Sequence, residues 1–126
     1  KLINSFGYAL KGMFLVLKDQ QNMRIHAVAV VVVTIAGLFL GLTAIEWSII
    51  ALCIGSVISA EMMNTAIEAL VDLVSPHFNE KAGKIKDIAA GAVLLTAVVA
   101  TVVAVYIFGN KIFNLFKFIF IFFYIL

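Results

Sequence analysis

Three carboxylates and one amide recur at helical spacing within the segment SAEMMNTAIEALVDLVSP. On a helical wheel at about 100° per residue, Asn64, Glu68 and Asp72 all fall near the direction of Glu61. These four residues, which we call the acidic stripe, therefore share one face of an otherwise apolar helix. Carboxylate oxygens bind Mg²⁺, which in proteins takes one or two carboxylates together with phosphate oxygens. The stripe is thus a candidate site for phosphate chemistry.

Other interpretations of the acidic stripe apply to some of its members. Asp72 lies near the end of the helix and could be solvated, and Asn64 with Thr65 could serve helix–helix packing. Glu61 and Glu68 together favour a functional role, because ionisable groups within a membrane segment are costly. At about 1.5 Å per residue, they lie about 20 Å and 10 Å from Pro76. The stripe is therefore expected to descend from the surface into the membrane.

Basic residues follow the acidic stripe at the start of the next apolar segment, where Lys84, Lys86 and Asp87 occur together. Carboxylates facing lysines indicate a divalent cation with phosphate groups, and lysine balances the charge of a bound nucleotide. The sequence has no Walker A pattern and no kinase-type glycine-rich loop with its paired lysine. A phosphotransferase built on this chain would not be one of the common soluble kinds.

The elements that position these residues follow from the composition. The chain has 126 residues, of which 64% are hydrophobic, more than the single core of a soluble domain of this size can bury. One proline and eight glycines leave little room for loops, so the chain should be mostly helical. A single cysteine, Cys53, excludes an internal disulfide framework and offers no metal-ligand pattern.

Hydropathy predicts an all-α integral membrane protein with three transmembrane helices and an N-terminal amphipathic surface helix. Within a membrane domain at 1–108, the expected elements are the surface helix at 2–21, spans at 26–43, 47–74 and 88–108, and a cytoplasmic loop at 75–87. The Phe-rich tail at 109–126 has no assigned role, and we interpret it as an interfacial or lipid-facing appendage.

The distribution of basic residues predicts the orientation. Seven of the nine lie before the first span or between the second and third, and only Lys111 and Lys117 do not. The positive-inside rule places these seven on the cytoplasmic side of the membrane.

The motif residues resemble a known family. The matching positions are Glu61, Asn64, Thr65, Ala66, Ile67 and Glu68, followed by Lys86 and Asp87. This pattern resembles the small prokaryotic diacylglycerol kinase and undecaprenol kinase family over about residues 1–108, and the segment NMRIH at 22–26 resembles its undecaprenol branch.

The resemblance implies a homotrimer in the bacterial inner membrane, with active sites shared between subunits near the cytoplasmic face. The implied reaction is phosphorylation of a lipid alcohol that depends on ATP and Mg²⁺. The expected substrate is undecaprenol, or diacylglycerol, which would give phosphatidic acid.

The resemblance also implies roles for individual residues. Glu61 looks like the general base that takes the proton from the lipid hydroxyl, and Glu68 looks like a metal ligand. Asn64 looks like the residue that holds the substrate and the cofactor in position. For ATP, the matching positions are Lys86 at the phosphates with Asp87 beside it, Tyr8 against the adenine, and Lys1 as a basic residue near the phosphates.

One position departs from the family pattern. Many members place a glutamate before the first span as a second metal ligand, and this chain has Gln20 there. Gln20 could coordinate Mg²⁺ through its amide oxygen, Asp19 could substitute, or water could fill the position. A neutral amide binds Mg²⁺ less strongly than a carboxylate does.

Two functions other than a lipid kinase are compatible with an acidic stripe. One is a small oligomer that conducts protons or cations along Glu61 and Glu68. The other is a structural or regulatory membrane subunit that docks a basic partner helix. Neither function requires Lys86 and Asp87. A conduction path should also continue with polar residues beyond Glu61, whereas the sequence there is the apolar segment WSIIALCIGSVI.

Overall fold

The structure is a computed structural model that describes residues 2–125. These residues form four helices and no strand: α1 (Leu2–Asp19), α2 (Gln21–Leu40), α3 (Ala44–Val74) and α4 (Glu80–Ile125). α2, α3 and α4 are long and apolar enough to cross a membrane. The prediction of an all-α protein with three membrane helices is therefore confirmed.

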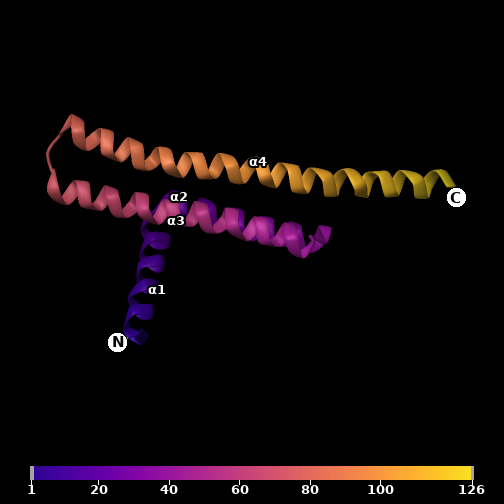
Figure 1. Cartoon of the computed structure of the whole chain (residues 1–126), viewed down its shortest axis with the longest axis horizontal. Coiled ribbons are helices and arrows are strands. Elements are labelled where there is room, and N and C mark those ends of the chain that lie inside the picture. The colour runs from indigo at the N-terminus through magenta and orange to yellow at the C-terminus, as the bar shows by residue number, and fades with distance from the viewer. Residues whose placement is uncertain (1, 126) are drawn as a thin grey trace.

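The helices form an elongated bundle with one helix set across it. α3 and α4 run side by side in opposite directions, α2 lies behind α3, and α1 projects crosswise from the side of this bundle (Figure 1). α3 and α4 make the most extensive contact, whereas α2 contacts each of them less. The first membrane helix is thus the loosely packed member of the bundle.

A tight turn joins α2 to α3. Gly41 ends α2 with a φ of +63°, a left-handed conformation that costs glycine little, and the backbone N–H of Leu42 donates to the carbonyl of Gly37. Thr43 then begins α3 with a capping box, in which its hydroxyl accepts from the backbone N–H of Glu46 and the Glu46 carboxylate accepts from the backbone N–H of Thr43. Three residues therefore suffice to reverse the chain.

Two ion pairs at opposite ends join α3 to α4. Glu46 Oε2 lies 3.0 Å from Lys111 Nζ near the α2–α3 turn, and Asp72 Oδ1 lies 2.5 Å from Lys86 Nζ near the α3–α4 connection. Between these pairs α3 advances 26 residues (46 to 72) and α4 advances 25 (86 to 111). The two helices are thus matched nearly residue for residue.

The position of Glu61 along α3 follows from this arrangement. α1 meets α2 and α3 around a cavity that Leu17, Met23 and Met62 line. Met62 follows Glu61 in the chain, so Glu61 lies level with α1. From Ala44 to Glu61, α3 rises about 26 Å, close to the thickness of about 30 Å of bilayer hydrocarbon. How far the acidic stripe descends into the membrane stays a prediction.

α4 is longer than the span expected at 88–108. The Asn79 side chain accepts hydrogen bonds from the backbone N–H groups of Lys81 and Ala82, so the helix begins at Glu80 and the connection shortens to residues 75–79. At the other end α4 passes through Gly109 into the Phe-rich tail without a break. One glycine inside a helix costs only about 1 kcal/mol, which is too little to end it. The role of the tail stays a prediction.

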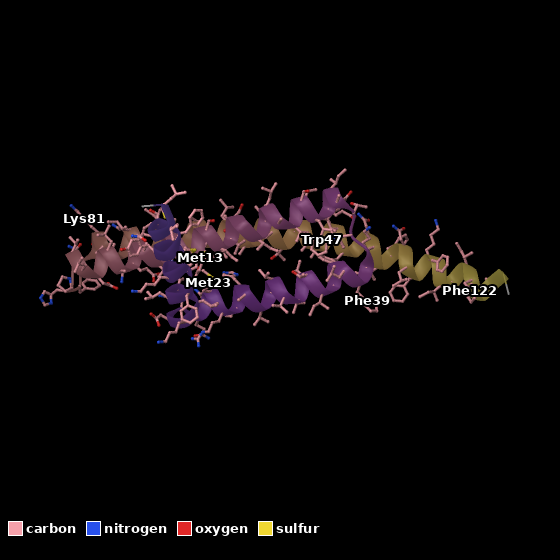
Figure 2. All side chains as sticks on the ribbon, turned by 90° about the horizontal axis from the view of Figure 1, so that it is seen from below. Met13, Met23, Phe39, Trp47, Lys81 and Phe122 are labelled. Carbon is pink, nitrogen blue, oxygen red and sulfur yellow. The ribbon has the colours of Figure 1, made fainter. Side chains whose placement is uncertain are left out.

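A small hydrophobic core closes the bundle beside the α2–α3 turn. Leu42, Ile50 and Ile107 are buried together, with Trp47 packed against them (Figure 2). A Cβ atom at Gly37 would lie 2.7 Å from the Trp47 ring, so glycine is what allows α2 to approach this side chain. The core seals the end of the bundle that lies farthest from Glu61.

Candidate active site

Glu61 is the most deeply buried charged side chain of the part of the chain that the structure describes. It lies in the middle of α3, only 1% exposed, and its Oε2 atom has no hydrogen-bond partner among residues 2–125. A buried polar atom without a partner costs about 1–3 kcal/mol, and a charged one costs more. Such an atom is retained where it has a role, which makes Glu61 the centre of the candidate site.

Asn64 lies one helical turn from Glu61 on the same face and is 7% exposed. Its Nδ2 atom donates to Glu68 Oε1 at 2.9 Å, which fixes the direction of the amide plane. Its Oδ1 atom is buried and has no hydrogen-bond partner among the described residues. Glu68 thus holds Asn64, and the amide oxygen is left to face a ligand.

The two unpartnered oxygens, Glu61 Oε2 and Asn64 Oδ1, define what the site can bind. Both are acceptors, so either a hydroxyl or amine donor or a cation would satisfy them. Carboxylate and amide oxygens are also ligands that Mg²⁺ accepts, and the Glu68 carboxylate is adjacent. These donor atoms therefore fit both an alcohol and a magnesium ion that carries phosphate.

Lys86 brings positive charge from α4 to the end of the acidic stripe. It donates to Asp72 Oδ1, and its side chain is about one-third exposed, so it can still reach a soluble ligand. Asp87, next along α4, is exposed. Asp72, which the sequence suggested could be solvated, is indeed 66% exposed, and it also pairs with Lys86. The signal in the sequence that could have predicted this pairing is that both residues lie a few positions from the connection between α3 and α4.

The remaining predicted ATP and metal residues do not join the stripe within this chain. Tyr8 lies on α1 with 74% of its surface exposed, and Gln20 is the residue before α2, where its side chain makes no capping bond. No hydrogen bond connects either to Glu61 or Glu68 in residues 2–125. Lys1 lies outside the described residues. Over the same residues, no three His, Cys, Asp or Glu side chains are grouped to hold a metal.

An apolar cavity adjoins the site, and sequence reasoning did not identify it. It has a volume of about 400 Å³ and lies between α1, α2 and α3, with Leu10, Phe14 and three methionines among its lining residues. The methionines are Met13, Met23 and Met62, of which the first two are labelled in Figure 2. Met62 follows Glu61 in the chain, so the cavity begins beside the candidate base. Three of the four methionines line this cavity, but their positions on three different helices gave no signal of it in the sequence.

Comparison with known proteins places this geometry in context. The family described as "Prokaryotic diacylglycerol kinase" matches this chain over residues 7–108, which include the whole acidic stripe and Lys86. The undecaprenol kinase of Bacillus subtilis is 39% identical over 111 residues, which is 88% of this chain and 90% of that protein.

Two diacylglycerol kinases are also similar. That of Synechocystis is 43% identical over 103 residues, covering 81% of this chain and 59% of that protein. That of Escherichia coli K12 is 29% identical over 102 residues, covering 81% of this chain and 84% of that protein. The similarity therefore extends over the surface helix and the three membrane helices.

Proposed function

Since this chain belongs to the prokaryotic diacylglycerol kinase family and is a lipid kinase, we propose that it transfers the γ-phosphoryl group of ATP to the hydroxyl of undecaprenol. The similarity to a protein named undecaprenol kinase over nine-tenths of that protein's length supports this substrate. Diacylglycerol, which would give phosphatidic acid, is the second substrate to test, because other relatives carry that name.

The observation that carries the proposal is the buried Oε2 atom of Glu61, which lies in the middle of a membrane helix and has no hydrogen-bond partner among residues 2–125. In the proposed reaction this carboxylate accepts the proton of the lipid hydroxyl. The lipid oxygen forms a bond to the γ-phosphorus, and the bond between that phosphorus and the bridging oxygen of ADP breaks. Asn64, held by Glu68, accepts a hydrogen bond from the substrate or contacts the cation, so that the reacting groups stay in line.

We propose that Glu68 holds Mg²⁺, with Gln20 or Asp19 as a possible further ligand. Asn64 bonds to only one of the two carboxylate oxygens of Glu68, which leaves the other for the metal. When bound, Mg²⁺ would neutralise charge on the phosphate oxygens. Lys86 binds the same phosphates and exchanges its Asp72 partner for them, with Asp87 beside it.

We further propose a homotrimer with shared active sites, in the bacterial inner membrane with the site on the cytoplasmic side. Tyr8 is largely exposed on α1, so its ring is available to the adenine of a nucleotide bound to a neighbouring subunit. The expected role of Lys1 at the phosphates belongs to the same proposal. The excess of basic residues on this side supports the orientation.

A conducting function is less well supported. On the face of α3 that carries Glu61, the next residues toward the other end of the helix are Val57, Ile54 and Ile50. None of them can relay a proton or bind a cation.

The test is phosphate transfer by the purified full chain in nanodiscs, with labelled ATP, Mg²⁺ and undecaprenol or diacylglycerol. We expect the wild type to phosphorylate undecaprenol, and Glu61→Gln to reduce kcat by about 10²-fold or more, as loss of a general base does. The matched control is Glu80→Gln, which removes an exposed carboxylate of α4 that pairs with Lys84. Near-normal turnover by Glu61→Gln would contradict its role, and transfer to neither lipid by the wild type would contradict the proposed reaction.

A further inference from the structure

A second apolar cavity lies inside the bundle between α2, α3 and α4. It has a volume of about 230 Å³, and α4 lines it with Ala97, Ala100, Thr101 and Ala104. The three alanines recur at helical spacing on one face, so their small side chains leave the space open. The Thr101 hydroxyl donates to the carbonyl of Ala97, which leaves the wall essentially apolar.

This inner cavity adjoins the cavity beneath α1, because Val30 of α2 and Ile58 of α3 line both of them. We call the two together the chain pocket. Along α3 it extends from Met62, beside the candidate base, to Ile50. This distance is about 18 Å, slightly more than half of the 30 Å hydrocarbon thickness.

The chain pocket and the acidic stripe lie on one line along α3. Val57 and Ile58, which line the inner cavity, precede Glu61 by one helical turn and therefore face the same side. A molecule with a polar end at Glu61 would thus have its apolar part directly over the pocket. At the far end Ile50 belongs to the core with Leu42 and Ile107, so the pocket is closed there.

From this geometry we propose that the chain pocket holds the hydrocarbon chain of the lipid substrate, and that the alanines of α4 set how long a chain fits. The proposal rests on the proposed function. The lining of the pocket is almost entirely apolar, so hydrocarbon is favoured here over water.

The matched register of α3 and α4 ranks the alanines by depth. Lys86 pairs with Asp72 and Lys111 with Glu46, so higher numbers on α4 lie nearer to the closed end. Ala97 is therefore closest to Glu61, Ala100 is intermediate and Ala104 is deepest. A leucine at each position would shorten the pocket to a different length.

The first experiment measures kcat/KM for a series of prenols from dimethylallyl alcohol to undecaprenol, in the full-length wild type, Ala100→Leu and Ala104→Leu. We expect wild-type kcat/KM to rise with chain length until the pocket is filled. Ala104→Leu should lower it by about tenfold for farnesol and longer chains only, because about two buried methylene groups are lost, and Ala100→Leu should do so from geraniol onward. Dimethylallyl alcohol, which is too short to reach past Ala100, should be turned over at wild-type rates by both. The control is Ala51→Leu, the same substitution on the exposed side of α3 at a similar depth.

The second experiment detects binding without turnover. Trp47 is the only tryptophan of the chain and packs against the core that closes the pocket, near the opposite end from Met23 (Figure 2). At saturating concentration, an alcohol about as long as the pocket and brominated at its terminal carbon should quench Trp47 fluorescence, and one about half as long should not. Ala104→Leu should remove this quenching, and Ala51→Leu should keep it.

The outcomes separate this proposal from the proposed function. An active wild type whose chain-length profile is the same in all variants, or Trp47 quenching that Ala104→Leu leaves unchanged, would overturn the chain pocket alone. A changed oligomeric state of Ala104→Leu without a length-dependent effect would show that a neighbouring subunit occupies the groove, and would overturn it too. A wild type that phosphorylates no lipid alcohol would overturn the function and this inference together.

Discussion

Asn64 donates a hydrogen bond to Glu68 one turn further along α3, at 2.9 Å, and both side chains follow the buried Glu61 on the same helix face. The bond uses the nitrogen of the amide and one oxygen of the carboxylate. It leaves the amide oxygen without a partner in the described part of the chain, beside the unpartnered oxygen of Glu61. Glu68 therefore orients the neighbour of the candidate base as well as being a candidate metal ligand.

Replacing Asn64 should affect catalysis more than folding. In Asn64→Ala the Glu68 carboxylate loses its donor and the substrate loses a fixed contact, and misplacement on this scale costs about 10²-fold in rate. We expect kcat/KM to fall by about that factor while the thermal unfolding temperature in detergent changes little. The control is Ser56→Ala, which removes an exposed hydroxyl that donates to the Leu52 carbonyl of its own helix. Wild-type kcat/KM in Asn64→Ala would contradict the positioning role.

The metal site can be probed from both of its expected ligands. Glu68→Gln should raise the Mg²⁺ concentration needed for half-maximal activity, because a neutral oxygen is a weaker ligand for this hard cation. Gln20→Glu should lower that concentration by supplying the carboxylate that the family resemblance implies at this position. Titration of activity with Mg²⁺ at saturating ATP measures both shifts. If Gln20→Glu leaves the titration unchanged, Gln20 is not near the metal in the assembled enzyme.

Replacing Lys86 should weaken ATP binding, whereas replacing its partner Asp72 should not. Lys86→Met removes a charged contact to the phosphates, which is typically worth 1.5–3 kcal/mol, so KM for ATP should rise by about tenfold or more. Asp72→Asn breaks the same exposed ion pair but should change stability by less than about 1 kcal/mol. Steady-state kinetics and thermal unfolding of both variants distinguish the roles. A loss of stability in both with unchanged KM would show that the pair is only structural.

The ion pair between Glu46 and Lys111, near the α2–α3 turn, should contribute to stability and not to catalysis. Lys111 and Glu46 are each about one-quarter exposed or less, and Lys111 also donates to the carbonyl of Gly41. In Lys111→Met this carbonyl and part of the Glu46 charge lose a partner, so we expect a loss of about 1–3 kcal/mol in the free energy of unfolding. Lys117→Met, the same change at an exposed position of α4, is the control. Equal stability of the two variants would show that the pair contributes nothing.

Local patterns in the sequence predict much of this architecture. The spacing of apolar residues gave the number of membrane helices, and the periodicity of Glu61, Asn64 and Glu68 placed them on one face. What the sequence could not supply was contact between elements. The pairing of Glu46 with Lys111 depends on a register of α3 against α4 that no local rule determines. The cavity beside Met62 depends on where α1 crosses the bundle, and on side chains too small to close it.

The length of α3 has a further consequence. From Glu61 to Val74 it rises about 20 Å beyond the level of α1, and the first turns of α4 rise beside it. In the proposed function, a water-soluble phosphate donor would bind among these projecting turns and its product would leave from them, while the lipid acceptor stays in the leaflet below. Neither reactant would have to leave the phase in which it dissolves, so the protein would join them without extracting a lipid.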